Sequence, residues 1–271
     1  FSYDRALQLD NYIRTFQHHC TFDLKIDFYV IYKFSSKLHL NSYEKLKKKF
    51  DNINFINEKI FKKDINSILN NYDGNQILSF GVDDIEFIRS FSLKEIYQSM
   101  NEYISSNKTK PIFSLRHGKN INKSIQCQLE KMELPEELNF KGKFINWKFK
   151  SSHGEWGYPL AVDCHFYPIK SLKNFIKFAY FHSPNSLEAA LQKLNNEFSE
   201  SVGISYSNSI CFNNPNNRVQ DEYQNFSLKS NTDDLAEKYL DDYVIEQRKE
   251  ILRIQDSTHK AFKYKLVKDK R

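Results

Sequence analysis

The first half of the chain alternates between helical and strand-like spacing of hydrophobic residues. Apolar residues recur at helical spacing over Arg5–His19, and a strand-like apolar run follows at Phe22–Tyr32. A second apolar run, Ile77–Ile85, contains two adjacent acids near its end. The pattern also predicts helices at Ser42–Phe50, Asp64–Tyr72 and Leu93–Ser105, and strands at Ile53–Ile56 and Lys110–Leu115. Because strands separated by helices pair in parallel through right-handed crossovers, we expect an α/β fold with a mainly parallel sheet flanked by helices.

The second half of the chain is less regular. Its pattern predicts a half-exposed strand at Phe144–Lys150, helices at Ser171–Phe181, Asn185–Phe198 and Asp233–Ile254, and a basic tail at Lys260–Arg271. We therefore expect one α/β domain over residues 1–225, followed by a C-terminal helical extension and basic tail over residues 226–271.

Composition narrows the class of protein. Aromatic residues make up 15% of the 271 positions, which argues against disorder, and no apolar run reaches the roughly 18 residues of a membrane span. The net charge of +6 is weak, and the basic residues do not form a known nucleic-acid-binding module. The cysteines are far apart, which excludes a disulfide framework and favours a reducing, cytoplasmic compartment.

The adjacent acids Asp83 and Asp84 are the first candidate for chemistry. Ligands of parallel α/β sheets bind beyond the carboxyl ends of strands, and an unpaired carboxylate there is costly to bury. Such a carboxylate can hold Mg²⁺ or Mn²⁺ through its hard oxygens, with a diphosphate completing the coordination. The alternative is a solvated turn or a cap of the next segment.

The opening segment F-S-Y-D-R-A-L-Q-L places Tyr3 and Arg5 just before the first predicted helix. An arginine at a helix N-terminus suits a phosphate group, and a tyrosine ring can stack on a nucleobase. The alternative is an ordinary helix cap formed by Ser2 or Asp4.

The segment H-G-E-W-G-Y-P-L-A-V-D-C-H-F-Y is the densest cluster of chemically able side chains. Asp163 and His165 have the spacing of two that would direct both into one cleft from a strand. Asp163 is the first candidate for a general base, and Glu155, in what we expect to be a mobile acceptor loop, is the second. Trp156 either stacks on a sugar or packs in the core, and His165 is either a metal or diphosphate ligand or a structural histidine.

Two further residues have competing interpretations. Glu188 follows S-P-N-S-L, so it is either the capping-box partner of Asn185 or a third candidate base at a helix N-terminus facing the cleft. Arg218, in N-N-P-N-N-R-V-Q, either closes over a phosphate or is an ordinary loop arginine.

Taken in order, several of these blocks resemble a known family. S-Y-D-R-A-L-Q-L is similar to the S-Y-x-R-P-L-Q-L start of bacterial, family-two-like glycosyltransferases with the GT-A fold. The resemblance covers about residues 1–220 and continues through F-Y-V-I-Y-K, F-G-V-D-D-I, S-L-R-H-G-K-N-I, W-G-Y-P-L-A-V-D-C-H, S-P-N-S-L-E-A-A-L and N-N-P-N-N-R-V-Q.

The resemblance implies a Rossmann-related fold and a hexosyltransferase-like activity. The enzyme would move a sugar from a nucleotide-sugar donor to a glycan or lipid-linked acceptor, as in the synthesis of capsule, lipopolysaccharide or other surface polysaccharide. It places Tyr3 and Arg5 near the base and phosphates, Tyr32 and Lys33 beside the nucleoside, Asp83 near the ribose or donor sugar, Asp84 at the metal and diphosphate, and Arg116 near the donor sugar or diphosphate.

The sequence departs from the family pattern at three points. Ala6 stands where the family has proline, and the acidic motif is V-D-D and not a full D-x-D. The family's first strand precedes the position of Phe1, so the resemblance implies a strand upstream of it.

The expected reaction is an inverting direct displacement. Asp163, Glu155 or Glu188 would take the proton of the acceptor hydroxyl, while Asp84 with Mn²⁺ or Mg²⁺ steadies the leaving diphosphate. The basic tail allows peripheral contact with the inner face of the membrane. Two alternatives stay open: a nucleotide- or carbohydrate-binding module without turnover, and a nucleotidyltransferase, whose glycine-rich phosphate loop is not visible among 7 glycines.

Overall fold

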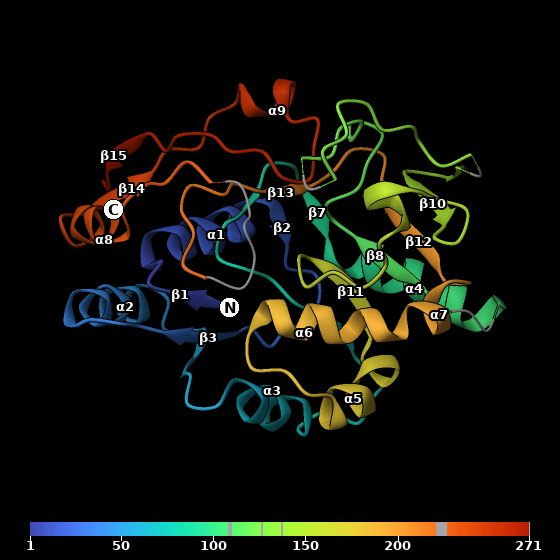
Figure 1. Cartoon of the computed structure of the whole chain (residues 1–271), viewed down its shortest axis with the longest axis horizontal. Coiled ribbons are helices and arrows are strands. Elements are labelled where there is room, and N and C mark those ends of the chain that lie inside the picture. The colour runs from blue at the N-terminus through green and yellow to red at the C-terminus, as the bar shows by residue number, and fades with distance from the viewer. Residues whose placement is uncertain (108–109, 126, 137, 221–226, 271) are drawn as a thin grey trace.

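The computed structural model has the α/β architecture that the sequence predicts (Figure 1). It describes residues 1–107, 110–125, 127–136, 138–220 and 227–270. One sheet contains β1 (Ser2–Tyr3), β3 (Tyr29–Lys33) and β4 (Asn54–Asn57), in the order β1-β3-β4. All its strands are parallel, as expected from the helices that separate them in sequence.

A second sheet has six strands and mixed direction. Its order is β5 (Ile77–Ser79), β11 (His165–Pro168), β8 (Ile112–Ser114), β12 (Val202–Tyr206), β10 (Phe144–Lys148) and β9 (Asn139–Lys141). β8 and β12 are parallel, whereas the other neighbours are antiparallel. The prediction of a mainly parallel sheet is therefore wrong for this sheet. A tight turn at Gly142, with φ +61°, joins β9 to β10 as a hairpin, and hairpin strands are necessarily antiparallel.

Short strand pairs complete the β structure. β2 (Cys20–Thr21) pairs with β7 (Phe91–Ser92), β6 (Ile85–Phe87) with β13 (Cys211–Asn213), and β14 (Tyr243–Ile245) with β15 (Leu266–Lys268).

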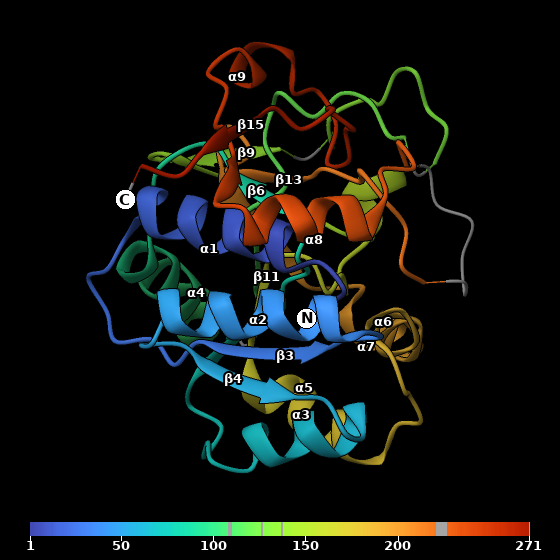
Figure 2. The same ribbon diagram turned by 90° about the vertical axis from the view of Figure 1, so that its left-hand side faces the viewer.

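Helices cover both faces of the three-stranded sheet. Figure 2 shows α2 on one side of β3 and β4 and α3 on the other. The alternation along β3 explains this: Val30 packs in the cluster that contains Tyr43 of α2, whereas Ile31 packs with Phe61 of α3. The helices are α1 (Ala6–His19), α2 (Lys37–Lys49), α3 (Phe61–Leu69), α4 (Leu93–Asn107), α5 (Ile169–Phe178), α6 (Pro184–Leu191), α7 (Asn195–Phe198), α8 (Thr232–Leu240) and α9 (Ile251–Ile254). Single 3-10 turns lie at Gly154–Gly157 and Gln192–Leu194, and no helix in the described part of the chain is long and apolar enough to cross a bilayer.

The C-terminal region is less helical than predicted. The helix expected over Asp233–Ile254 is divided into α8, β14 and α9, because the chain turns at Asp242, which has φ +61°. The expected basic tail contributes β15, which pairs antiparallel with β14. The proposed domain boundary at residues 225 and 226 lies outside the described residues, so it stays a prediction.

The apolar run that carries the acids is interrupted. β5 ends at Ser79, and Asp83 and Asp84 occupy a turn before β6 begins at Ile85. The turn joins strands of two different sheets, so the acids lie at the edge between them. This position is the one that ligands of α/β folds commonly use.

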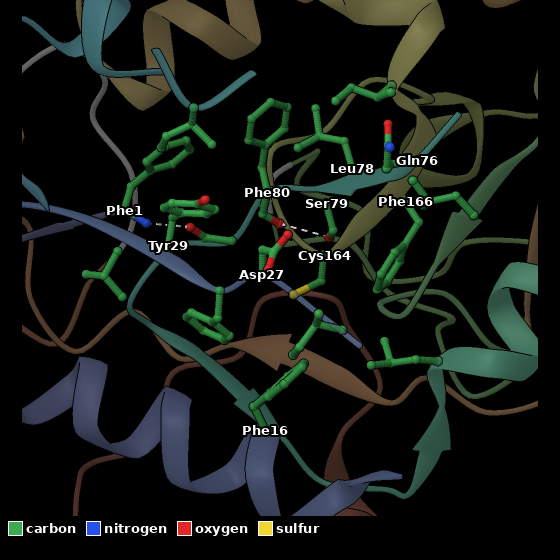
Figure 3. Close-up of a pocket in the computed structure, with 18 of the residues that line it drawn as sticks. Phe1, Phe16, Asp27, Tyr29, Gln76, Leu78, Ser79, Phe80, Cys164 and Phe166 are labelled. Carbon is green, nitrogen blue, oxygen red and sulfur yellow. Dashed lines mark hydrogen bonds between the residues drawn. The ribbon is translucent and has the colours of Figure 1, made fainter. Parts of the chain in front are cut away.

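A largely apolar cavity of about 670 Å³ lies between β3 and β5 (Figure 3). Phe1 lies at its wall, where the N-terminal ammonium donates a hydrogen bond to the Gly81 carbonyl at 2.7 Å. β1 pairs with β3 in the register Ser2 to Tyr32, so a strand continuing β1 toward its amino end would pass opposite Val30 and Tyr29. The strand expected upstream of Phe1 stays a prediction.

Candidate functional site

Arg5 connects the start of the chain to the acid turn. It is the N-terminal cap residue of α1 and is buried, with Nη1 2.9 Å from Asp83 Oδ1 and 3.6 Å from Asp84 Oδ2. Its Nη2 donates a hydrogen bond to the carbonyl of Asn217. The structure therefore brings together Arg5, Asp83 and Asp84, which the sequence analysis assigned to different parts of one nucleotide-sugar site.

The two acids of the turn differ in accessibility. The Asp83 side chain is 4% exposed, whereas that of Asp84 is 16% exposed and accepts a hydrogen bond from Asn213 Nδ2 at 3.0 Å. Burial raises the pKa of Asp84 to about 6 against the opposing effect of the Arg5 charge, and the negative charges of Asp83 and Asp163 raise it further. Asp84 is thus the member of the pair that a ligand can reach.

A second arginine–carboxylate pair lies at the same edge. Arg116 follows β8, and its Nη1 is 3.1 Å from Asp163 Oδ2. Its Nη2 lies 2.9 Å from Nδ1 of His259, which accepts the hydrogen bond. Burial raises the pKa of Asp163 to about 6, while Arg116 opposes the shift and the charge of Glu188 adds to it. Asn213 donates a hydrogen bond to Asp84 and lies near enough to Asp163 to lower its pKa, while the charge of Asp163 raises the pKa of Asp84, so the two pairs lie in one polar site.

Glu188 lies beside this site and does not cap its helix. The cap of α6 is Ser183, in a capping box with Ser186, because Pro184 occupies the first helical position. The predicted cap at Asn185 is therefore wrong. Glu188 instead accepts hydrogen bonds from the Tyr158 hydroxyl at 2.8 Å and from the Val162 backbone N–H at 3.0 Å.

Glu155 and Trp156 are held inside the fold. Glu155 is 9% exposed and accepts a hydrogen bond from the Thr258 hydroxyl, so the predicted mobile acceptor loop is instead a buried single turn of 3-10 helix. Trp156 is fully buried, with its ring 4.8 Å from that of Trp147 in an edge-to-face contact. Trp156 therefore packs in the core, which leaves sugar stacking to other side chains.

His165 does not share a face with Asp163. Cys164 between them has φ +52°, a left-handed conformation that breaks the alternation of side chains expected of a strand. His165 is buried next to the ring of His117, and its Nδ1 lies 3.2 Å from the Pro159 carbonyl. Burial, assisted by the positive charge of Arg116, lowers the pKa of His165 to about 3. A structural role accounts for these contacts.

The remaining predicted residues are Tyr3, Lys33, Tyr32 and Arg218. Tyr3 is half-buried next to β3, with the Lys33 ammonium 5.6 Å from its ring centroid, so this pair can border a nucleoside. Tyr32 is buried, and its ring lies 4.7 Å from that of Tyr43, so core packing accounts for it. Arg218 is exposed and lies close in sequence to Asn217, which contacts Arg5.

Three contributors were missed by the sequence analysis: Asn213, Thr258 and His259. Asn213 lies in the N-N-P-N-N block, where only Arg218 was considered. Thr258 and His259 immediately precede the predicted basic tail, and the chain there runs beside β13, where the Asn213 N–H donates to the Thr258 carbonyl at 2.8 Å. Because this pairing is distant in sequence, no local pattern could have located His259 against Arg116.

The site offers few protein ligands for a divalent cation. Within the described ranges, no group of three histidine, cysteine or acidic residues could hold a metal ion. Asp84 is a suitable single ligand, since it is partly exposed and, although burial raises its pKa to about 6, it is ionised at neutral pH. Mg²⁺ is commonly bound by one or two carboxylates, with substrate phosphates and water completing the coordination.

Comparison with known proteins adds one finding. The chain is similar to a glycosyltransferase. It is 28% identical over 179 residues to the bifunctional glycosyltransferase pgtA of Dictyostelium discoideum. The matched segment covers 59% of this chain. The match spans 22% of the length of that relative. No protein-family model matches the chain.

Proposed function

We propose that the protein is a glycosyltransferase that moves a sugar from a nucleotide-sugar donor to a glycan or a lipid-linked saccharide, in the synthesis of surface polysaccharide. The main support is that the Arg5–Asp83 and Arg116–Asp163 pairs lie at one edge of the sheets, with Asp84 near enough to Asp163 for the charge of Asp163 to raise its pKa. The similarity to a bifunctional glycosyltransferase supports the same reaction class.

In this proposal, the donor lies across the Arg5 side of the site. Tyr3 and Lys33 border the nucleoside, and the guanidinium of Arg5 faces the diphosphate. Asp84 is the protein ligand for Mn²⁺ or Mg²⁺, which when bound supplies positive charge to the phosphate oxygens. Arg116 is held by Asp163 and His259, so its charge is fixed in orientation and faces the donor sugar or the diphosphate.

The transfer is a direct displacement with inversion. The acceptor hydroxyl oxygen forms a bond to the anomeric carbon of the donor sugar, and the bond from that carbon to the diphosphate oxygen breaks. The diphosphate leaves with the bonding electron pair, and the hydroxyl proton passes to Asp163. With a pKa raised to about 6, Asp163 is ionised at neutral pH yet basic enough to accept the proton. Glu188 and Glu155 are the alternative bases.

The test combines binding with turnover. Thermal unfolding is measured with a panel of nucleoside diphosphates and nucleotide sugars, with and without Mn²⁺, and stabilising donors are then assayed for hydrolysis and transfer. We expect at least one nucleotide sugar to stabilise the protein and to be consumed. Asp84→Asn should abolish turnover, whereas Asp51→Asn, at an exposed acid after α2, should not. If Asp84→Asn retains full transfer, the assignment of Asp84 is wrong.

One observation favours a second candidate, a nucleotide- or carbohydrate-binding module without turnover. Each proposed base is already engaged: Asp163 by Arg116, Glu155 by Thr258, and Glu188 by Tyr158. Calorimetric binding of a nucleotide sugar with no detectable product would favour this candidate over the enzyme.

A further inference from the structure

Three strongly exposed apolar side chains lie on two neighbouring segments, one just before α3 and one after α5. Figure 1 shows α3 and α5 next to each other at the lower edge of the view. Ile60, just before α3, is 51% exposed, and Phe178 and Tyr180, at the end of α5 and in the loop before α6, are 78% and 84% exposed. Phe178 and Tyr180 are the most exposed large apolar side chains among the described residues. Their two segments meet where the rings of Phe61 and Phe181 lie 6.0 Å apart. We call this surface the α3–α5 face.

Lysines surround the α3–α5 face. The Lys177 ammonium lies 5.5 Å from the Phe178 ring centroid, and that of Lys62 lies 5.9 Å from the ring centroid of Phe181. Within the residues that the structure describes, no carboxylate forms an ion pair with any of four lysines here: Lys59, Lys62, Lys63 and Lys177. The nearby Asp64 is occupied as a cap, because it accepts the backbone N–H groups of Lys59 and Ile60.

Three lysines of the predicted basic tail make contacts with acids or a backbone carbonyl. Lys260 lies 2.6 Å from Asp256 and Lys265 lies 2.6 Å from Glu246, while Lys268 donates to the carbonyl of Asp241. These contacts hold the C-terminal segment against the protein. Among the described residues, the α3–α5 face therefore has more lysines without an ion pair than the tail has.

We propose that the α3–α5 face docks on the surface of an anionic lipid bilayer. Phe178 and Tyr180 enter the headgroup region, where aromatic rings are favoured, and the surrounding lysines face lipid phosphates. The observation that selects a bilayer is the combination of exposed aromatic rings with unpaired lysines, which complements a negatively charged interface. This inference rests on the proposed function: the same loop leads into α6, which carries Glu188, so docking would bring the acceptor side toward a lipid-linked saccharide.

The experiment compares binding to two kinds of vesicle by cosedimentation: phosphatidylcholine alone, and phosphatidylcholine mixed with phosphatidylglycerol. We expect the protein to bind the mixed vesicles at least about tenfold more strongly, since several lysines contribute. The double variant Phe178→Ser/Tyr180→Ser and the double variant Lys63→Glu/Lys177→Glu should each lose at least about tenfold in binding to the mixed vesicles.

Matched controls locate the effect. Lys263→Glu/Lys270→Glu makes the same charge change at exposed positions of the tail, and Phe22→Ser/Tyr97→Ser removes two exposed aromatic rings elsewhere. Both controls should bind mixed vesicles within about twofold of the unsubstituted protein. Thermal unfolding of each variant checks that the fold is retained.

Several results would overturn the proposal: no preference for anionic vesicles, a loss confined to the tail variant, or an equal loss in the Phe22→Ser/Tyr97→Ser control. Retention of binding by both α3–α5 variants would do the same, as would capture of a protein partner through this face without vesicle binding. Stabilisation by nucleotide sugars, measured without vesicles, reports on the proposed function separately. Vesicle binding without any nucleotide-sugar binding would contradict the enzyme and leave the docking face standing.

Discussion

The Arg5 guanidinium and the Asp83 carboxylate form a buried ion pair, with Nη1 and Oδ1 2.9 Å apart. The two side chains are only 10% and 4% exposed. The pair joins the cap residue of α1 to the acid turn, so it fixes the shape of the candidate donor site.

Removal of one partner should therefore be costly. Arg5→Met leaves Asp83 buried without its counter-charge, and we expect the free energy of unfolding to fall by about 3–5 kcal/mol. Urea denaturation at neutral pH measures the change. The double variant Arg5→Met/Asp83→Asn should recover part of the loss, because the more deeply buried Asp83 charge is removed and only the more exposed Asp84 then lacks the arginine. A single variant within about 1 kcal/mol of the parent would show that the pair is not buried in solution.

The protonation of Asp163, together with that of Asp84, should control the acid limb of the pH–rate profile. Burial raises the pKa of Asp163 to about 6, so kcat/KM for transfer should decline as the pH falls through about 6 and the proposed base becomes protonated. Asp163→Asn should lower kcat by roughly 10²–10⁴-fold. If Glu188→Gln has this effect and Asp163→Asn does not, Glu188 is the base.

His259 should act by positioning Arg116. Burial and the adjacent Arg116 charge hold the pKa of His259 well below its usual value, so the ring is neutral and accepts the hydrogen bond of the guanidinium. His259→Ala removes this acceptor and should lower kcat/KM by about tenfold or more. His259→Asn offers an amide oxygen in place of Nδ1 and should recover most of the activity. Equal losses in both variants would contradict a positioning role.

The cavity between β3 and β5 should accept an extended strand. Added to a chain that begins at Phe1, a Val-Ile-Val extension would lie opposite Val30, Tyr29 and Phe28 in the register of β1. We expect the free energy of unfolding to rise by roughly 2 kcal/mol, the net of apolar burial and chain ordering. A Gly-Pro-Gly extension is the control, because proline lacks the N–H that pairing requires. Equal unfolding midpoints for the two extensions would contradict strand insertion.

Local pattern was sufficient for elements that depend on nearby residues. The helix predicted over Arg5–His19 is α1 (Ala6–His19), and the acids of the V-D-D motif do lie at a sheet edge beside Arg5. The sequence did not reveal features that depend on distant pairing or on one backbone angle. The β15 strand and the contact of His259 with Arg116 depend on distant pairing, and the left-handed Cys164 separates His165 from Asp163.

Glu86 should make the protein less stable as the pH rises. It is 3% exposed on β6, its nearest hydrogen-bond donor is Asn214 Nδ2 at 3.4 Å, and burial raises its pKa to about 7. Because the folded state holds this proton more tightly than the unfolded chain does, the cost of ionising Glu86 is fully present above about pH 7. The cost falls as the pH decreases toward the unfolded value of about 4.3. Glu86→Gln should therefore be more stable than the parent at pH 8, by about 3 kcal/mol, and this advantage should shrink by about 2 kcal/mol at pH 5.5. Urea denaturation of both proteins at the two pH values measures the difference, and an advantage that is independent of pH would mean that Glu86 does not titrate in this range.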